Sequence, residues 1–235
     1  MYFGIFDPTF IVLIPAILFT LFAQAKVKNA YSKYSRIPVK SGITGKQAAR
    51  KILDNNGMKH VPISQIAGEL TDNYNPKEDK MQLSAGTAME SSIAAVAIAA
   101  HESGHAIQDG TNYGFLNFRI AMVPIVNIVS GASWPLILVG LAIIYAGSHT
   151  AGNLIFDIGI VMFVVVVLFH TVTLPVEFNA SKRAVNQLVE LNIIDESEVK
   201  GTKAVLSAAA MTYVAALATS ILNLVRILLI RGRNN

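Results

Sequence analysis

The sequence contains no cysteine, so it can form no disulfide bond and offers no thiolate ligand to a metal. Charged residues are also scarce: they make up 14% of the 235 residues, compared with about 25% in soluble domains. Hydrophobic residues account for 53% of the chain, and the formal net charge is a mild +4. We expect no nucleic-acid partner. The scarcity of charge predicts an integral membrane protein whose partner is the lipid bilayer.

Three long stretches contain no Lys, Arg, Asp or Glu, and a fourth, at residues 8–23, is strongly apolar. A helix needs about 20 apolar residues to cross a bilayer. No basic residue precedes the fourth stretch, so we expect a retained span there rather than a signal peptide. The pattern predicts a single domain over residues 1–235 with four transmembrane helices, at about residues 3–24, 120–146, 154–175 and 204–226.

Basic residues are concentrated between Lys26 and Lys51, where eight occur without any acidic residue. The positive-inside rule then predicts that this segment is cytoplasmic. The connection at residues 147–153 has no Lys or Arg, which favours the outer side. Residues 40–118 and 176–203 are therefore both expected on the cytoplasmic side of a multi-pass protein of the cell membrane. Three arginines follow the fourth span and leave its orientation open: Arg226, Arg231 and Arg233.

The first cytoplasmic segment has the signals of a small folded region. Thr44 is a suitable cap for an amphipathic helix that extends to Asn55. Residues 61–74 and 81–84 resemble two short strands around a polar turn. This predicted β-hairpin has two interpretations. It is either purely structural, or an edge strand that can pair with an extended peptide.

A helix of small residues carries the most informative motif, His101, Glu102 and His105. Thr87 and Glu90 resemble a capping box at its start. Residues four apart share a helix face, so His101 and His105 can point at one cation. Glu102 lies about 100° around the helix, where it can reach a water without being a ligand. This pattern is typical of zinc hydrolases, in which the carboxylate accepts a proton from an activated water.

A catalytic zinc normally has three protein ligands and one open position. Glu177 is the strongest candidate for the third ligand. It is expected on the same side as His101, at the start of a new helix after a kink at Pro175, and it shares a face with Ala180, Ser181 and Ala184. The alternative is an acidic residue placed at a helix start by the helix dipole.

These motifs resemble those of the HtpX and CAAX-prenyl-protease type of integral-membrane zinc peptidases, in which a later helix supplies the third ligand. The sequence is more similar to the YugP-like neutral zinc metallopeptidase family. That resemblance covers nearly the whole chain, including residues 70–76, 175–181 and 208–216. One departure from the HtpX pattern is Ser181, where that pattern has an Asp able to orient a ligand histidine.

The resemblance implies a membrane gluzincin with a zincin-like HExxH helix and one Zn²⁺ per chain. His101, His105 and Glu177 would be the zinc ligands, and Glu102 would be the general base and acid of a zinc metalloendopeptidase. The substrates would be polypeptides, including membrane proteins. The sequence does not predict the oligomeric state, the cleavage specificity or the residue that stabilises the oxyanion.

Other polar residues are ambiguous. His170 either faces the same cavity or bonds a neighbouring helix. Arg183, Asn179 and Tyr113 are candidates for substrate contact, and nothing in the sequence ranks them.

Two functions of other classes are compatible with the sequence. One is a non-catalytic membrane scaffold with a vestigial metal site. The other is a metal transporter whose path would be lined by Asn127, Asp157 and His170.

Overall fold

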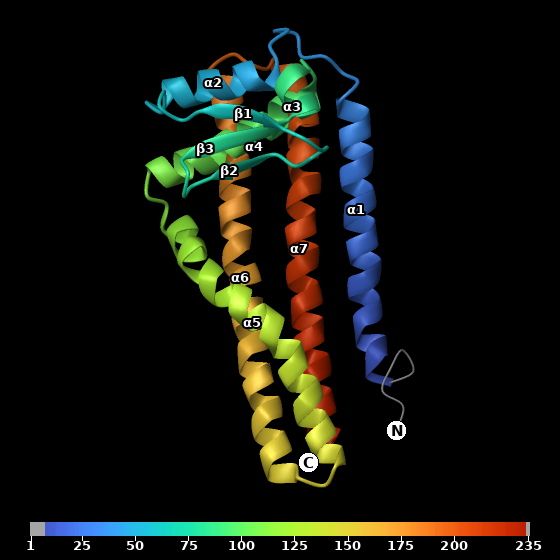
Figure 1. The fold of residues 1–235 in the computed structure, drawn as a ribbon. Coiled ribbons are helices and arrows are strands. Elements are labelled where there is room, and N and C mark those ends of the chain that lie inside the picture. Colours follow the sequence, from blue (N-terminus) through green and yellow to red (C-terminus); the bar gives the residue numbers. More distant parts are fainter. Residues whose placement is uncertain (1–7, 234–235) are drawn as a thin grey trace. The chain divides into compact units, whose positions relative to one another are not determined.

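The computed structural model describes residues 8–233. They are mostly helical, as predicted, with one small sheet. Residues 3–7 of the first predicted span lie outside the described range. The elements in chain order (Figure 1) are η1 (Pro8–Leu13), α1 (Ile14–Tyr34), α2 (Gly45–Asn55), β1 (Ile63–Ile66), β2 (Asn73–Asn75), β3 (Lys80–Ser84), α3 (Ala85–Met89), α4 (Ile93–Gly110), α5 (Gly114–Tyr145), α6 (His149–Glu190) and α7 (Glu196–Arg233).

The chain divides into two compact units. The first contains the residues up to Phe22, then Phe118–Leu174, and the residues from Tyr213 onward. The second contains Ala23–Asn117 and Pro175–Thr212. Helices α1, α5, α6 and α7 each contribute residues to both units.

Within residues 8–233, four helical segments are long and apolar enough to cross a membrane: Pro8–Tyr34, Gly114–Tyr145, His149–Glu190 and Glu196–Arg233. Each overlaps one predicted span, so the prediction of a mostly α-helical membrane protein with four such helices is confirmed. Helices α6 and α7 are longer than their uncharged stretches, because each helix continues into a flanking polar segment.

In the first unit, α5 and α6 form an antiparallel pair joined by a short turn (Figure 1). Glycines let their backbones approach closely. A Cβ on Gly140 would lie 2.5 Å from the backbone nitrogen of Phe156, and one on Gly159 would lie 2.7 Å from the Ile137 side chain. Close approach through small residues is the usual way in which membrane helices pack. The core of this unit includes Ile137 and Phe156, together with Ile227 of α7.

Pro175 does not end the third apolar helix. We expected a kink and a new helix start there, but α6 is continuous from His149 to Glu190. Proline removes one backbone N–H donor and crowds the preceding turn, and long helices in membrane proteins accommodate this locally. Glu177 is therefore an interior helix residue, and the helix-dipole interpretation of its position is wrong.

Local caps define the helices of the second unit. Thr44 and Gln47 form a capping box that begins α2, as the sequence indicates. The metal-motif helix α4 begins later than expected, because Ser92 caps it by accepting from Ala95 N. Thr87 lies instead in α3 and donates to the carboxylate of Asp72. The predicted capping box at Thr87 is thus wrong.

The sheet has three strands in the order β1-β3-β2. Strands β2 and β3 form the expected antiparallel hairpin, with Tyr74 opposite Met81. The stretch 61–74 is not one strand, however, since Gly68 and Leu70 have positive φ values of 101° and 55°. Its first part, β1, pairs in parallel with β3. The β2–β3 hairpin leaves one edge of β2 unpaired within the sheet.

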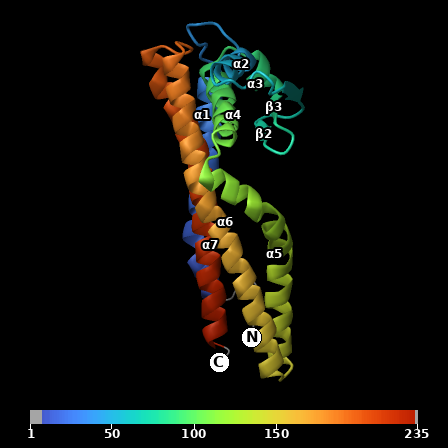
Figure 2. The ribbon, with the colours of Figure 1, turned by 90° about the vertical axis from the view of Figure 1, so that its left-hand side faces the viewer.

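The core of the second unit surrounds α4. Helices α2 and α3 and strands β2 and β3 all contact α4, and Figure 2 shows these elements gathered together. Ala99 and Ala100 of α4 are fully buried, and Ala184 and Leu188 of α6 belong to the same core. The small residues on both helices therefore bring the α4 motif against α6, as their sequence positions indicated.

Candidate metal centre

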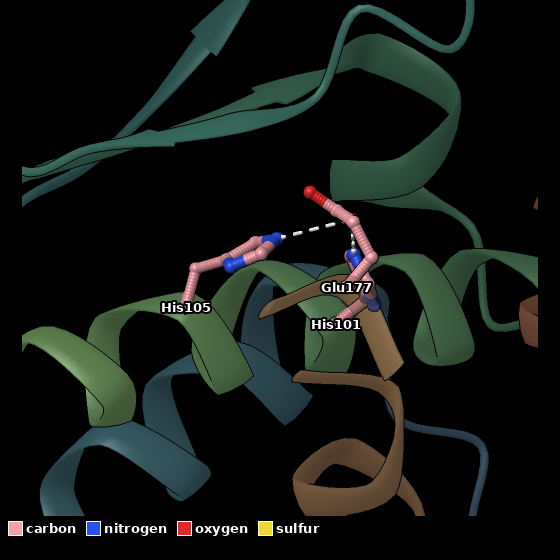
Figure 3. A group of neighbouring side chains, drawn as sticks. All are labelled: His101, His105 and Glu177. Carbon is pink, nitrogen blue, oxygen red and sulfur yellow. Dashed lines mark hydrogen bonds and ion pairs between the residues drawn. The ribbon is translucent and has the colours of Figure 1, made fainter. Parts of the chain in front are cut away.

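Three side chains predicted as ligands converge in the second unit. His101 and His105 lie one turn apart on α4 and direct their imidazoles at Glu177 of α6 (Figure 3). Nε2 of His101 is 3.3 Å from Oε2 of Glu177, and Nε2 of His105 is 3.6 Å from the same oxygen. The three donor atoms all lie within 4.8 Å of one another. Within residues 8–233, this is the one group of His, Cys, Asp or Glu residues found with such spacing.

The spacing suits a tetrahedral metal. Ligand nitrogen and oxygen atoms lie about 2.0–2.1 Å from zinc, which places two donors of a tetrahedron about 3.3 Å apart. The two histidine–glutamate separations are close to that edge length. Two imidazoles and one carboxylate also form a common donor set of catalytic zinc sites.

The burial of Glu177 favours the binding of a cation between these three side chains. The Glu177 residue is only 1% exposed, and a buried carboxylate is costly unless positive charge or hydrogen bonds compensate it. Its oxygen faces two imidazole nitrogens. A neutral imidazole protonated at Nδ1 presents a lone pair at Nε2, so the carboxylate and the two rings would then meet as three acceptors. Three acceptors in contact repel one another, and this repulsion is relieved either by extra protons on the rings or by a metal ion that all three share.

Gln108 determines which nitrogen of His105 carries the hydrogen. Its amide nitrogen lies 2.8 Å from the carbonyl oxygen of Val176 and 3.0 Å from Oδ1 of Asn179. A carbonyl only accepts, so the amide nitrogen must be on that side. The amide oxygen is then the atom 3.0 Å from Nδ1 of His105. Nδ1 therefore donates, which leaves the lone pair of Nε2 available to a metal.

Ser181 contacts the other histidine. Its Oγ lies 3.1 Å from Nδ1 of His101, at the position where the HtpX pattern has an Asp. The sequence left open which group orients this imidazole, and the structure assigns the contact to the serine hydroxyl. A serine can accept from Nδ1–H as an Asp does, although without a negative charge.

Glu102 lies beside the three donors without joining them. Its Oε2 accepts a hydrogen bond of 2.9 Å from the backbone N–H of Tyr74 on β2. Burial raises the pKa of Glu102 to about 7, against the opposing effects of His101 and of that N–H. A carboxyl group with a pKa near neutrality can both take and return a proton.

Tyr74 joins the hairpin to α4 through its side chain. Its hydroxyl lies 2.7 Å from Oδ1 of Asp79 and 2.8 Å from Oδ2 of Asp109. Burial and these two carboxylates raise the pKa of the Tyr74 phenol, so it remains a donor. Asp79 also lies 3.0 Å from Nε2 of His60. The hairpin is therefore held over α4 by both the backbone and the side chain of one residue.

The structure shows the contacts and locations of the polar residues whose roles the sequence left ambiguous. Oδ1 of Asn179 accepts from Nε of Arg183 as well as from Gln108, and the Arg183 guanidinium lies over the Tyr113 ring at 5.9 Å. These residues support the metal site through Gln108. His170 lies in the first unit and is not in the metal-donor group. Sequence reasoning missed Gln108, whose signal was its spacing of three residues from His105.

The chain was compared with known proteins. A family model described as "Putative neutral zinc metallopeptidase" matches residues 9–232. The "Putative membrane protease YugP" of Bacillus subtilis (strain 168) is 42% identical over 218 residues, which cover 92% of this chain and 93% of that protein. No solved structure matches the chain. The extent of these matches, together with a His-His-Glu donor group whose glutamate is buried, supports a family assignment. This chain is a membrane protein that belongs to the neutral zinc metallopeptidase family.

Proposed function

We propose that the chain is a multi-pass membrane endopeptidase that depends on one zinc ion, held by His101, His105 and Glu177. The observation that carries this proposal is the convergence of these three donors beside a buried fourth residue, Glu102. A peptidase with this donor set needs a carboxylate that moves protons, and Glu102 occupies the required place on α4.

When bound, zinc supplies Lewis acidity, which activates a water and polarises a peptide carbonyl. The residues of the chain supply the rest. Tyr74 N–H holds Oε2 of Glu102, which leaves Oε1 to accept a proton and to return it to the leaving amine. Ser181 and Gln108 hold the two imidazoles in orientation.

The substrates are proposed to be polypeptides, including membrane proteins. Strand β2 has a free edge in the sheet, and the N–H of Tyr74 on that strand points at Glu102. An extended peptide that pairs with this edge would accept from the same N–H. Substrate pairing would then compete with Glu102 for this N–H, and Oε1 would remain the oxygen that moves the proton.

The test uses the purified full-length protein in detergent, with fluorescently labelled casein as the probe. Glu102→Gln is expected to lose cleavage and keep zinc, because it changes the base and no ligand. Glu177→Ala is expected to lose both. Glu78→Gln, a change at an exposed residue of the hairpin turn, is the matched control and should retain both.

Two results would contradict the proposal. Cleavage by Glu102→Gln at the wild-type rate would remove Glu102 from the mechanism. Equal zinc content in Glu177→Ala and the wild type would remove Glu177 from the ligand set. Zinc binding by a wild type that cleaves nothing would favour the scaffold alternative.

A further inference from the structure

A groove lies between α6 and α7, in the same unit as the metal centre, and none of the three metal donors lines it. Its cavity volume is about 460 Å³. The lining surface is mainly apolar, with two lysines and no acidic residue, and it includes Phe178, Lys182, Lys203, Leu206, Ser207 and Ala210.

The two lysines are the feature that the fold leaves unexplained. Lys182 and Lys203 come from different helices and line the same groove. Both are exposed, and neither has an ion-pair partner among residues 8–233. Lys40, by contrast, has its carboxylate partner at 2.8 Å. Two unpaired cations above an apolar surface complement a ligand that has an anionic head and an apolar tail.

The groove lies where each of the two helices passes between an uncharged segment and a charged one. The uncharged stretch of α6 ends at Val176, two residues before Phe178, the first groove residue of that helix. On α7, Lys203 is the last charged residue before an uncharged stretch that starts at Ala204 and includes Ala210. Such a boundary is where lipid headgroups meet the ends of membrane helices, and where lysines bind anionic lipids.

We propose that this groove binds an anionic phospholipid, with the phosphate between Lys182 and Lys203 and an acyl chain along Phe178, Leu206 and Ala210. Phe178 is half exposed despite its size, and an acyl chain would cover its ring. The groove does not overlap the metal donors, although Ser181 lines it and also contacts His101.

The experiment measures lipid binding by the full-length protein in neutral detergent. Phosphatidylglycerol and phosphatidylcholine with identical acyl chains are titrated, and binding is followed by native mass spectrometry and by the shift in melting temperature. We expect phosphatidylglycerol to bind and stabilise the protein more than phosphatidylcholine. Inorganic phosphate at the same concentration should give no shift, because it has no acyl chain.

Variants separate the groove from general charge effects. Lys182→Gln with Lys203→Gln should weaken phosphatidylglycerol binding by roughly ten- to thirty-fold. Lys59→Gln with Lys200→Gln removes the same charge from exposed positions outside the groove and should change the affinity less than twofold. Ser207→Phe, which fills the groove from an exposed position, should weaken binding while both lysines remain.

Equal binding of the two lipids would overturn the proposal, and so would equal losses in the groove and control double variants. Lipid binding that is unchanged in the groove variant, with a raised KM for casein, would overturn it in favour of a peptide site. The lipid-binding and melting-temperature readouts do not require zinc or cleavage, so the lipid site can fail or succeed independently of the proposed peptidase activity.

Discussion

Gly104 of α4 faces the backbone of Ala180 on α6 with no room for a side chain. A Cβ atom on Gly104 would lie 2.5 Å from the carbonyl oxygen of Ala180 and 3.1 Å from its Cα. The two helices that carry the metal donors therefore meet backbone to backbone. This contact sets how far Glu177 lies from the histidines of α4.

The first prediction follows from that contact. Gly104→Ala should separate α4 from α6 and destabilise the protein by about 1–3 kcal/mol, the usual cost of overpacking. Zinc affinity should fall as well, because the donors move apart. Thermal unfolding and zinc content check both effects. Gly114→Ala, where a Cβ meets nothing within 4 Å, is the control, and equal behaviour of the two variants would refute the argument.

A second prediction concerns Gln108. Gln108→Leu removes the acceptor that fixes Nδ1–H of His105, and loss of such supporting contacts typically lowers metal affinity by about 10–100-fold. Competition with a zinc chelator measures this change in the purified protein. Gln65→Leu alters an exposed residue of β1 and should leave the affinity as it is. Wild-type affinity in Gln108→Leu would show that the imidazole needs no such support.

The third prediction concerns the hairpin. Tyr74→Phe removes the hydroxyl between Asp79 and Asp109, and hydrogen bonds to charged groups contribute about 1.5–3 kcal/mol. Amide hydrogen exchange over residues 73–84 should therefore become faster, while α2 keeps its protection. Tyr113→Phe is the control, because the Tyr113 hydroxyl has no hydrogen bond among the described residues. Amide exchange over residues 73–84 in this variant should match the wild type.

Membrane orientation provides a fourth prediction, and the absence of cysteine makes it straightforward to test. Ser148→Cys should react with a membrane-impermeant maleimide in intact cells. Lys77→Cys should react only after permeabilisation, because its segment follows the basic cluster. The reverse pattern would invert the topology. Arg231 is paired with Asp157 at 2.7 Å, but the rule counts Lys and Arg regardless of such pairing, so the orientation of the fourth span is tested separately by a cysteine placed at Gly232.

Sequence reasoning predicted the elements whose signal is local. The four long apolar helices follow from composition, and His101 and His105 follow from helical spacing. Thr44 capped α2 as expected, yet a similar pattern at Thr87 failed, because Asp72 takes its hydroxyl. A capping residue competes with tertiary partners that the sequence does not reveal.

The supporting contacts of the site were harder to predict, since they depend on how α4 and α6 pack. Ser181 is 80 residues from His101, and Gln108 is linked to its partner Asn179 only across the helix interface. The continuous α6 was also missed, because a proline signals a break when only its neighbours in sequence are considered. The position of Glu177 beside the two histidines, by contrast, agrees with what its small-residue face and the family resemblance predicted.

The Tyr74 hydroxyl can donate to only one of its two carboxylate neighbours at a time. A phenol carries one hydrogen, whereas two carboxylates lie within 2.8 Å of it. When the hydrogen points to Asp79, Tyr74 is bonded to the turn of its own hairpin. When it points to Asp109, the hairpin is bonded to α4. Rotation about a single C–O bond therefore exchanges the side-chain bond to α4 for one within the hairpin, while the backbone N–H of Tyr74 keeps its bond to Glu102.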